Sequence, residues 1–283
     1  MNERHMTAWR ASLLLAFSIL ASNDALAARR ADSPGRAAPP PAQPATPPQS
    51  DVWQRPQLSR GTLRQTQYVD AAALDLTRLI PPPPTNDSAE TRAELDQMLT
   101  IQKTRTPAQV ARATADADVN VNRFADAFAD PPGFDVKNLP RTQSLFRKIG
   151  TDERVVVGTG KDGFARPRPF VLEPRLQPVV KTPPNGSYPS GHTMWSYTVG
   201  LVLADMVPER RAQLMARAAE YAQNRVIAGV HYPSDIEGGK MAATAFAAAL
   251  FASPAFQSDL AAAKAELRKA LDLSPALTSS ALD

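Results

Sequence analysis

Cysteine is absent from this chain of 283 residues, and histidine occurs three times, as His5, His192 and His231. Without cysteine the protein can form no disulfide and has no thiol nucleophile, so the packing of its core must hold the fold. So few histidines exclude a histidine-rich metal cluster, and no group of carboxylates has recognisable metal-ligand spacing. We therefore expect neither a metal nor any other cofactor.

Long apolar runs are scarce as well. The run nearest the N-terminus, residues 11–21, follows the basic residues Arg4 and Arg10 and precedes Ala25-Leu26-Ala27. This order predicts a cleaved signal peptide over residues 1–27, and hence a periplasmic or secreted protein. A membrane anchor is the alternative, but the run is about half of the ~20 residues that a helical span needs. Later apolar runs are short and suit buried helices, so we expect no membrane span in the mature chain.

Aromatic residues make up only 6% of the chain, whereas alanine is frequent, and this composition favours helices. The segment 33–50 consists largely of proline and alanine and carries too little apolar surface to fold. Apolar residues are 43% of the whole chain, which is enough for one sizeable core. We predict a disordered linker over residues 28–56, a single helical domain over 57–275 and a flexible tail over 276–283.

Capping patterns mark most of the expected helix starts. A polar residue followed three positions later by an acid or an amide, the pattern of a capping box, begins at Asp87, Thr106 and Ser234, and Ser253 is expected to cap the last helix. Strand signals are weak and limited to the short β-branched run at 155–157. We therefore class the domain as all-α, a compact helical bundle, with helices from about 88 onward, over 106–129, over 208–228, from 234 onward and over 254–271.

The net charge of +4 is modest. The basic residues Arg210, Arg211 and Arg217 lie near Glu209 and Glu220 in the sequence. This mixture of signs indicates a solvated helix face rather than a surface for nucleic acid. We expect no nucleic acid as a partner.

One of the two histidines outside the predicted signal lies in the stretch SYPSGHTMWSY, residues 187–197. Ser190 is a good N-cap for the helix that follows, and Gly191 allows a ligand to approach the backbone closely. The free N–H groups and the positive end of the helix dipole make this start a site for an anion. His192 lies in the first turn, where it can donate a proton to whatever binds there.

The other histidine, His231, lies in a joint between two helices that Gly229 and Pro233 interrupt. Asp235 follows four residues later, at the start of the next helix, and Arg225 lies in the last turns of the preceding one. A carboxylate that accepts a hydrogen bond from one imidazole nitrogen fixes the tautomer and leaves the other nitrogen as a nucleophile. The alternative is a capping aspartate beside a surface histidine.

Further basic residues lie upstream, in the stretch KDGFARPRP that begins at Lys161. Its prolines are expected to hold the whole stretch extended, so that Lys161 and Arg168 project from a stiff segment. Together with Arg225 they provide three cations for one small, multiply charged anion. Arginine suits this task because its planar fork matches pairs of anion oxygens.

These residues resemble the three-part signature of the type 2 phosphatidic acid phosphatase superfamily and, within it, the bacterial class A non-specific acid phosphatases. The resemblance runs from about Pro81 to Leu267. The three parts are Lys161 with Arg168-Pro169, then Pro189-Ser190-Gly191-His192, and finally Arg225 with His231 and Asp235. The resemblance implies a helical, exported enzyme that hydrolyses a broad range of small phosphate monoesters at acid pH without a metal. It also suggests a homodimer.

The resemblance implies a role for each motif residue. The phosphate-binding residues are Lys161, Arg168, Ser190, Gly191 and Arg225. The catalytic residues are His231, which attacks phosphorus to give a phosphohistidine, Asp235, which orients His231, and His192, which protonates the leaving alcohol and then activates water. Because this duty requires a protonated His192, we expect an optimum below neutral pH.

One motif position departs from the family, because Asn224 stands where a serine usually precedes the arginine. This change alters the residue next to Arg225, and it keeps a non-catalytic phosphate-binding relative as an alternative. A vanadium-dependent haloperoxidase is a second alternative, since such enzymes resemble this family in fold and anion site. A membrane lipid phosphatase is less favoured because the chain lacks the expected spans.

Overall fold

The computed structural model describes residues 66–128 and 134–274. The predicted signal peptide, linker and C-terminal tail, and the predicted domain start at residue 57, lie outside these ranges. Within them the helical segments are α1 (Leu76–Leu79), α2 (Ala89–Thr104), α3 (Pro107–Ala115), η1 (Val121–Phe128), η2 (Val136–Asn138), α4 (Pro140–Phe164), α5 (Pro169–Leu172), α6 (Gly191–Met206), η3 (Pro208–Arg210), α7 (Arg211–Ile227), α8 (Pro233–Ala252) and α9 (Pro254–Ala270). The described residues contain no strand, so the all-α prediction is confirmed.

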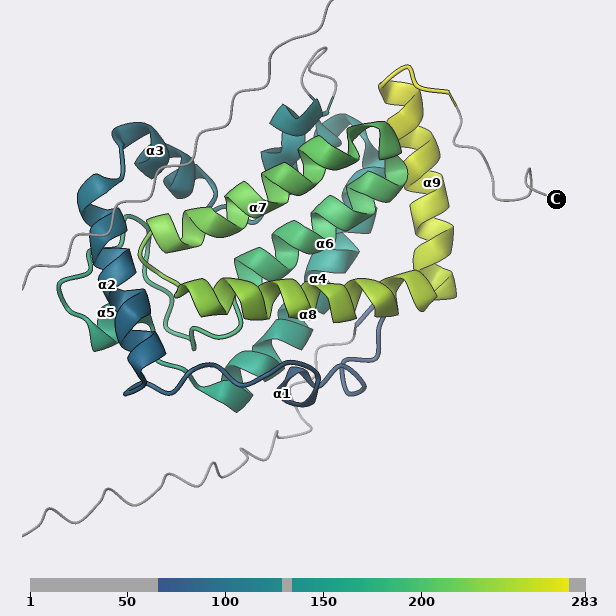
Figure 1. Ribbon diagram of the computed structural model, residues 1–283. Helices are drawn as coiled ribbons and strands as arrows, with labels where there is room; N and C mark the ends of the chain where they lie inside the picture. Colours follow the sequence, from purple (N-terminus) through teal and green to yellow (C-terminus); the bar gives the residue numbers. More distant parts are fainter. Residues whose placement is uncertain (1–65, 129–133, 275–283) are drawn as a thin grey trace, which may run out of the picture. The chain divides into compact units, whose positions relative to one another are not determined.

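The helix α6 forms the centre of the bundle (Figure 1). It lies between α7 and α8, with α4 behind it, while α9 packs across one end and α2 and α3 lie at the other. Most of its residues are buried, among them Met194, Val199, Val202 and Leu203. A helix that is apolar around its whole circumference must be covered on all sides. Since α6 carries the Pro-Ser-Gly-His motif at its start, this burial places the motif inside the bundle.

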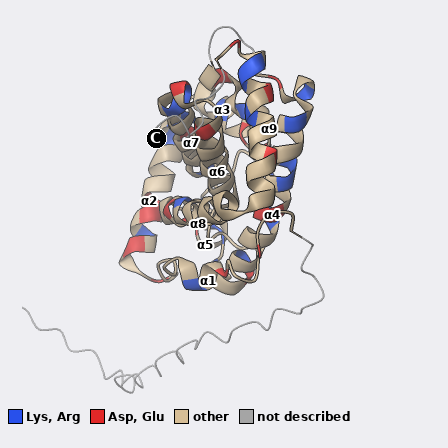
Figure 2. Cartoon of the chain, turned by 90° about the vertical axis from the view of Figure 1, so that its right-hand side faces the viewer, with Lys and Arg blue, Asp and Glu red and all other residues tan. Residues whose placement is uncertain are grey.

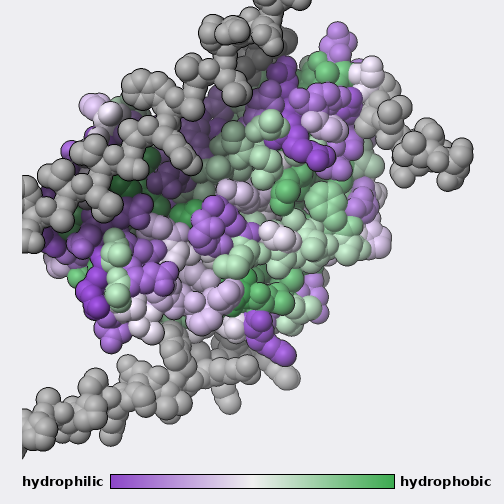
Figure 3. All heavy atoms as spheres, in the orientation of Figure 1, coloured by the Kyte–Doolittle hydropathy of each residue, from purple (hydrophilic) through white to green (hydrophobic). Residues whose placement is uncertain are grey.

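The outward faces of the helices carry most of the charge. Figure 2 shows basic and acidic residues interspersed over these faces, and Figure 3 shows apolar residues along the exposed side of α8 toward α9. None of the helices in the described ranges is long and apolar enough to cross a membrane.

Several capping predictions hold. Thr106 caps α3 in a capping box with Gln109, and Ser253 caps α9. At α2 the cap is Ser88, one residue after the predicted Asp87, and its hydroxyl accepts from the N–H of Thr91.

The prediction of an extended segment from Lys161 to Pro169 is wrong for its first half. Lys161 lies in the last turn of α4, a helix of 25 residues that also contains the short β-branched run at 155–157. The prolines at 167 and 169 restrict only the residues directly before them, so the helix continues to Phe164. It ends at Ala165, which has a left-handed backbone with φ of 47°. Lys161 is therefore held by a long helix.

Two other boundaries differ from the prediction. The helix expected over 106–129 ends at Ala115, and a 3-10 segment, η1, takes up the apolar pattern; polar side chains such as Asp116 compete with the helical backbone there. The helix expected to be capped by Ser234 begins at Pro233 with Tyr232 as its N-cap. Proline is favoured at the first helical position, and the Asp235 side chain accepts from the backbone N–H of Tyr232.

Candidate active site

The ends of five helical segments bring the predicted site residues together. Lys161 lies in the last turn of α4 and Arg225 near the end of α7, while Arg168 is the N-cap of α5. The motif at the start of α6 and Asp235 in the first turn of α8 lie opposite each other, because the N–H of Ser190 donates to the backbone carbonyl of Asp235 at 3.0 Å. These residues therefore come from the ends of helical segments, whereas His231 lies in the joint between α7 and α8.

His231 and Asp235 form a buried pair. The His231 Nδ1 lies 3.0 Å from Oδ2 of Asp235, and the pair is almost fully shielded from solvent. A carboxylate can only accept, so Nδ1 carries the hydrogen and Nε2 presents a lone pair. In this structure Nη1 of Arg168 donates to that lone pair, with 2.9 Å between Nη1 and Nε2. The pairing predicted from the four-residue spacing is present.

Lys161 and Arg168 are buried among backbone carbonyls. The Nζ of Lys161 donates to the carbonyls of Gly186 and Ser187 at 2.9 and 3.2 Å. Arg168 donates to the carbonyl of Val230 at 2.8 Å, and both the carbonyl and the side chain of Asn185 accept from it. These neutral acceptors hold the two cations in place without cancelling their charge.

Arg225 has a different environment. It is 2% exposed, and its Nε and Nη1 have no hydrogen-bond partner. A buried guanidinium without a partner costs free energy, so a site that contains one is built to receive an acceptor. Burial lowers the pKa of Arg225 to about 10, although Tyr221 and Asp116 oppose this.

The cations also act on one another. Burial, and then the charge of Arg168, lower the pKa of Lys161 to about 7. Burial, with the charge of Arg225, lowers the pKa of Arg168 to about 10, although Asp235 opposes this. The pKa of His231 falls well below its usual value, first through burial and then through the three cations. Such mutual effects require proximity, so the cations and His231 share one positively charged site.

The start of α6 completes this site. The hydroxyl of Ser190 accepts from the N–H and the hydroxyl of Thr193, so Ser190 is the N-cap as predicted. The N–H groups of Gly191 and His192 have no partner within the helix, because the first turn of any helix leaves its donors free. They add two neutral donors to the three cations.

His192 lies beside these donors. Its Nε2 is 3.1 Å from the carbonyl of Ala117, and its ring stacks on that of Tyr221 with centroids 6.2 Å apart. Since a carbonyl only accepts, Nε2 carries the hydrogen and Nδ1 is the nitrogen left for proton exchange. Burial, and then the charge of Arg225, lower the pKa of His192 to about 3.

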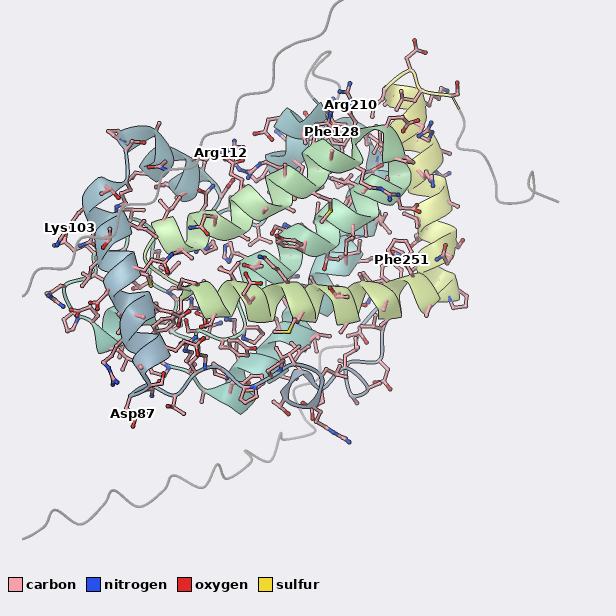
Figure 4. All side chains as sticks on the ribbon, in the orientation of Figure 1. Asp87, Lys103, Arg112, Phe128, Arg210 and Phe251 are labelled. Atoms are coloured by element: carbon pink, nitrogen blue, oxygen red, sulfur yellow. The ribbon has the colours of Figure 1, made fainter. Side chains whose placement is uncertain are left out.

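The unusual residue Asn224 takes part in a buried network behind the site. Its amide donates to Oδ2 of Asp116 at 2.7 Å, and Arg217 donates to the other oxygen of the same carboxylate. Arg112 on α3 reaches Glu220 on α7, and Figure 4 shows it at the gap between these helices. The prediction of a solvated face is therefore wrong for Arg217, which is buried because the Asp116 carboxylate lies beneath α7.

Sequence reasoning missed three buried residues at the site. Ser187 donates its hydroxyl to Oδ2 of Asp235, and Arg166 donates to Oδ1 at 2.8 Å. Glu153, on α4, lies beside Gly191, since its Oε1 would be 3.6 Å from a Cβ placed there. This oxygen has no partner. No residue spacing singled these residues out; the extended backbone imposed by Pro167 was the only signal near Arg166.

The residues present do not suggest a metal site. Among the described residues, no cluster of three or more histidine, aspartate or glutamate side chains could hold an ion. The start of α6 offers backbone N–H groups next to the three buried cations, and such an arrangement suits an anion. The arrangement can therefore bind a tetrahedral oxyanion and offer it a nucleophile, Nε2 of His231, and a proton carrier, Nδ1 of His192.

Comparison with known proteins agrees with this geometry. Residues 152–258 match the PAP2 superfamily. A non-specific acid phosphatase of Providencia stuartii is 32% identical over 80% of this chain and 91% of its own length. Another of Salmonella typhimurium is 33% identical over 66% of this chain and 78% of its own. Among solved structures, a bacterial vanadium-dependent iodoperoxidase matches with a TM-score of 0.50 and 18% identity, over 64% of this chain and 53% of its own. That likeness concerns the fold alone.

Proposed function

The chain belongs to the class A non-specific acid phosphatases of the PAP2 superfamily and is a phosphomonoesterase, and we propose that it works through a phosphohistidine on His231. The observation that carries the proposal is the unbalanced positive charge around His231. Lys161, Arg168 and Arg225 are buried with lowered pKa values and neutral or absent acceptors. A phosphate dianion supplies the missing charge.

Binding replaces bonds within the site by bonds to the phosphoryl group. The guanidinium of Arg225 donates to it through its free Nε and Nη1, and Arg168 turns from Nε2 of His231 to a phosphoryl oxygen. The N–H groups of Gly191 and His192 donate to a further oxygen at the positive end of α6. Ser190 caps this end of the helix and lies next to the bound oxyanion. These groups contact the phosphoryl oxygens and not the alcohol part of the ester, which supports activity on a broad range of monoesters.

In the first chemical step the lone pair of Nε2 of His231 attacks phosphorus. The phosphorus–oxygen ester bond breaks, and its electron pair stays on the alcohol oxygen, which takes a proton from His192. Asp235 balances the charge that forms on the His231 ring. In the second step His192 removes a proton from water, whose oxygen attacks phosphorus and releases His231. The cations stabilise the spread charge of the transferring group in both steps.

We propose an optimum below neutral pH. Burial, and then the neighbouring cations, lower the pKa of His192 to about 3 and keep it neutral. The charge of a bound dianion offsets the charge of the cations and raises the pKa of His192 again, so that His192 takes up a proton when the substrate binds. A rate that stays constant from about pH 5 to pH 9, across the usual range of histidine titration, would contradict this role for His192.

The test is to trap the intermediate. Wild type and His231→Ala are mixed with labelled p-nitrophenyl phosphate and quenched in alkaline denaturant, since phosphohistidine is labile in acid. We expect label on the wild type that acid removes, and none on His231→Ala. A wild type that turns over without retaining label would remove the covalent route. Assaying peroxide-dependent bromide oxidation with vanadate in the same preparation tests for haloperoxidase activity.

Two further points belong to the proposal. The signal peptide predicted over residues 1–27 supports a periplasmic or secreted enzyme, and mass spectrometry of the mature N-terminus tests it by looking for a start at Ala28. The homodimer suggested by the resemblance is tested by sedimentation of the purified enzyme.

A further inference from the structure

Asp235 is held by more groups than an orienting carboxylate needs. Its Oδ2 faces His231 and accepts from Ser187 and the backbone of Tyr232, while its Oδ1 accepts from Arg166. Arg166 is the one cation among the described residues that forms an ion pair with this carboxylate. The orientation of the carboxylate, and through it of the His231 ring, therefore depends on where Arg166 lies.

Arg166 itself cannot move freely. Its side chain is 2% exposed, and its guanidinium lies 3.8 Å over the ring of Tyr232. Nη1, which donates to Asp235, also donates to the hydroxyl of Ser234 at 2.8 Å, and Nη2 donates to Oε2 of Glu94 at 3.1 Å. The planar guanidinium is thus held by Asp235 and Ser234 at one nitrogen, by Glu94 at the other and by Tyr232 on its face, and these contacts fix it in one position.

Glu94 anchors the far end of this chain of contacts. It is buried on α2, and its second oxygen accepts from the backbone N–H of Ser234 in the first turn of α8. Glu94 thus binds both Arg166 and the segment that carries Asp235. Glu94, Arg166, Asp235 and His231 form one continuous buried line from α2 to the nucleophile.

We propose that Arg166 is a positioning residue for the nucleophile: it fixes the Asp235 carboxylate so that Nε2 of His231 faces phosphorus, and Glu94 holds Arg166 in place. The inference rests on the proposed function, because it requires His231 to attack. A nucleophile must meet phosphorus in line, and a displacement of about 1 Å can cost about 10²-fold in rate. Arg166 acts through Asp235 and does not touch the substrate, so its removal changes kcat and leaves KM nearly constant.

The opposing view is that Arg166 only ties α2 to α8 and stabilises the fold. A double-mutant cycle separates the two roles. Arg166→Gln, Asp235→Asn and the double variant are assayed with p-nitrophenyl phosphate for kcat and KM. We expect Arg166→Gln to lower kcat by about 10²-fold with KM within about threefold, and the double variant to match Asp235→Asn, because a residue that acts through Asp235 loses its effect when Asp235 is already altered.

Two more variants guard against loss of folding. Glu94→Gln keeps Arg166 and removes only its anchor, and we expect a smaller fall in kcat at constant KM. Arg268→Gln is the matched control, because Arg268 is also buried and paired, with Glu209, on α9 at the far end of the bundle. It should lower the unfolding midpoint in urea without changing kcat.

The outcomes distinguish the two proposals. An unchanged kcat in Asp235→Asn overturns the role of the His231–Asp235 pair and this inference with it. A large effect of Asp235→Asn, combined with effects of Arg166→Gln that multiply fully in the double variant or that fall on KM alone, overturns only the positioning role of Arg166. A loss of kcat in Arg166→Gln that disappears in the Asp235→Asn background supports it.

Discussion

Replacing Glu153 by glutamine should make the stability of the protein less sensitive to pH. Glu153 is buried on α4, and its Oε1 has no hydrogen-bond partner. Burial raises the pKa of its carboxyl to about 8, although the positive charges of Lys161 and Arg154 pull it down. The folded protein therefore holds a proton on this group at neutral pH, whereas the unfolded chain releases it near pH 4.5.

The sign and size follow from this difference. The folded state binds the proton more tightly, so the contribution is fully present below about pH 4.5 and is lost as the pH rises toward 8. At pH 7, which lies about 2.5 units above the pKa of this carboxyl in the unfolded chain, ionisation of the carboxyl lowers the free energy of the unfolded chain. At 1.4 kcal/mol for each unit, this removes roughly 3 kcal/mol from the free energy of unfolding. Glutamine keeps the shape and the polar group but does not titrate, so this loss is absent in Glu153→Gln.

The assay is urea unfolding at pH 5 and pH 7 for wild type, Glu153→Gln and Glu237→Gln. Glu237 is a suitable control because its side chain is 65% exposed. Other titrating groups are common to all three proteins, so the difference between their pH slopes isolates Glu153. Between these two pH values we expect wild type and the control to lose about 2–3 kcal/mol of unfolding free energy relative to Glu153→Gln. Parallel slopes would refute the reasoning, since they would mean that Glu153 is ionised in the folded protein.

Four further substitutions test the packing and the site. Gly238→Ala should lower the free energy of unfolding by about 1–3 kcal/mol, because its Cβ would lie 2.3 Å from the ring of Tyr188. Gly158→Ala is the control: nothing lies within 4 Å of its added Cβ, so it should be neutral or stabilising by up to about 1 kcal/mol. The urea midpoints of the two variants are compared. Arg225→Lys should weaken competitive inhibition by inorganic phosphate about tenfold or more, because a point charge replaces a fork; an unchanged inhibition constant would remove Arg225 from the phosphate site. Asn224→Ala removes a hydrogen bond from a buried carboxylate and should cost about 1–3 kcal/mol of unfolding free energy; no change in the urea midpoint would show that this bond contributes nothing.

The parts of the site that could be predicted from the sequence depend on short separations. His231 and Asp235 are four residues apart across a helix start, so their contact depends on local backbone geometry. Ser190 caps a helix only one residue away, and the cap of Ser253 is equally local. Interactions of this kind have the same geometry in every fold, so the sequence was sufficient to predict them.

The helix α4 could not be predicted in this way, because its sequence weakens the helical signal. Gly158, Gly160 and Gly163 each lower helix propensity, yet α4 passes through all of them. Tertiary packing explains two: a Cβ at Gly160 would lie 3.0 Å from Leu76, and one at Gly163 would lie 2.4 Å from Thr77. Both partners belong to α1, so these glycines leave room for α1 against α4.

Residues that support the site differ in principle from residues that form it. The arginines that we propose to bind phosphate, Arg168 and Arg225, stand in short motifs of the sequence. The guanidinium of Arg166 contacts the ring of Tyr232, Asp235 and other groups on α2 and α8, all about 70 positions away in the sequence. Asn224 illustrates the same point, since its amide donates to Asp116, more than a hundred residues upstream. No short sequence spacing marks such partners, so their roles follow only from burial and from the atoms they contact.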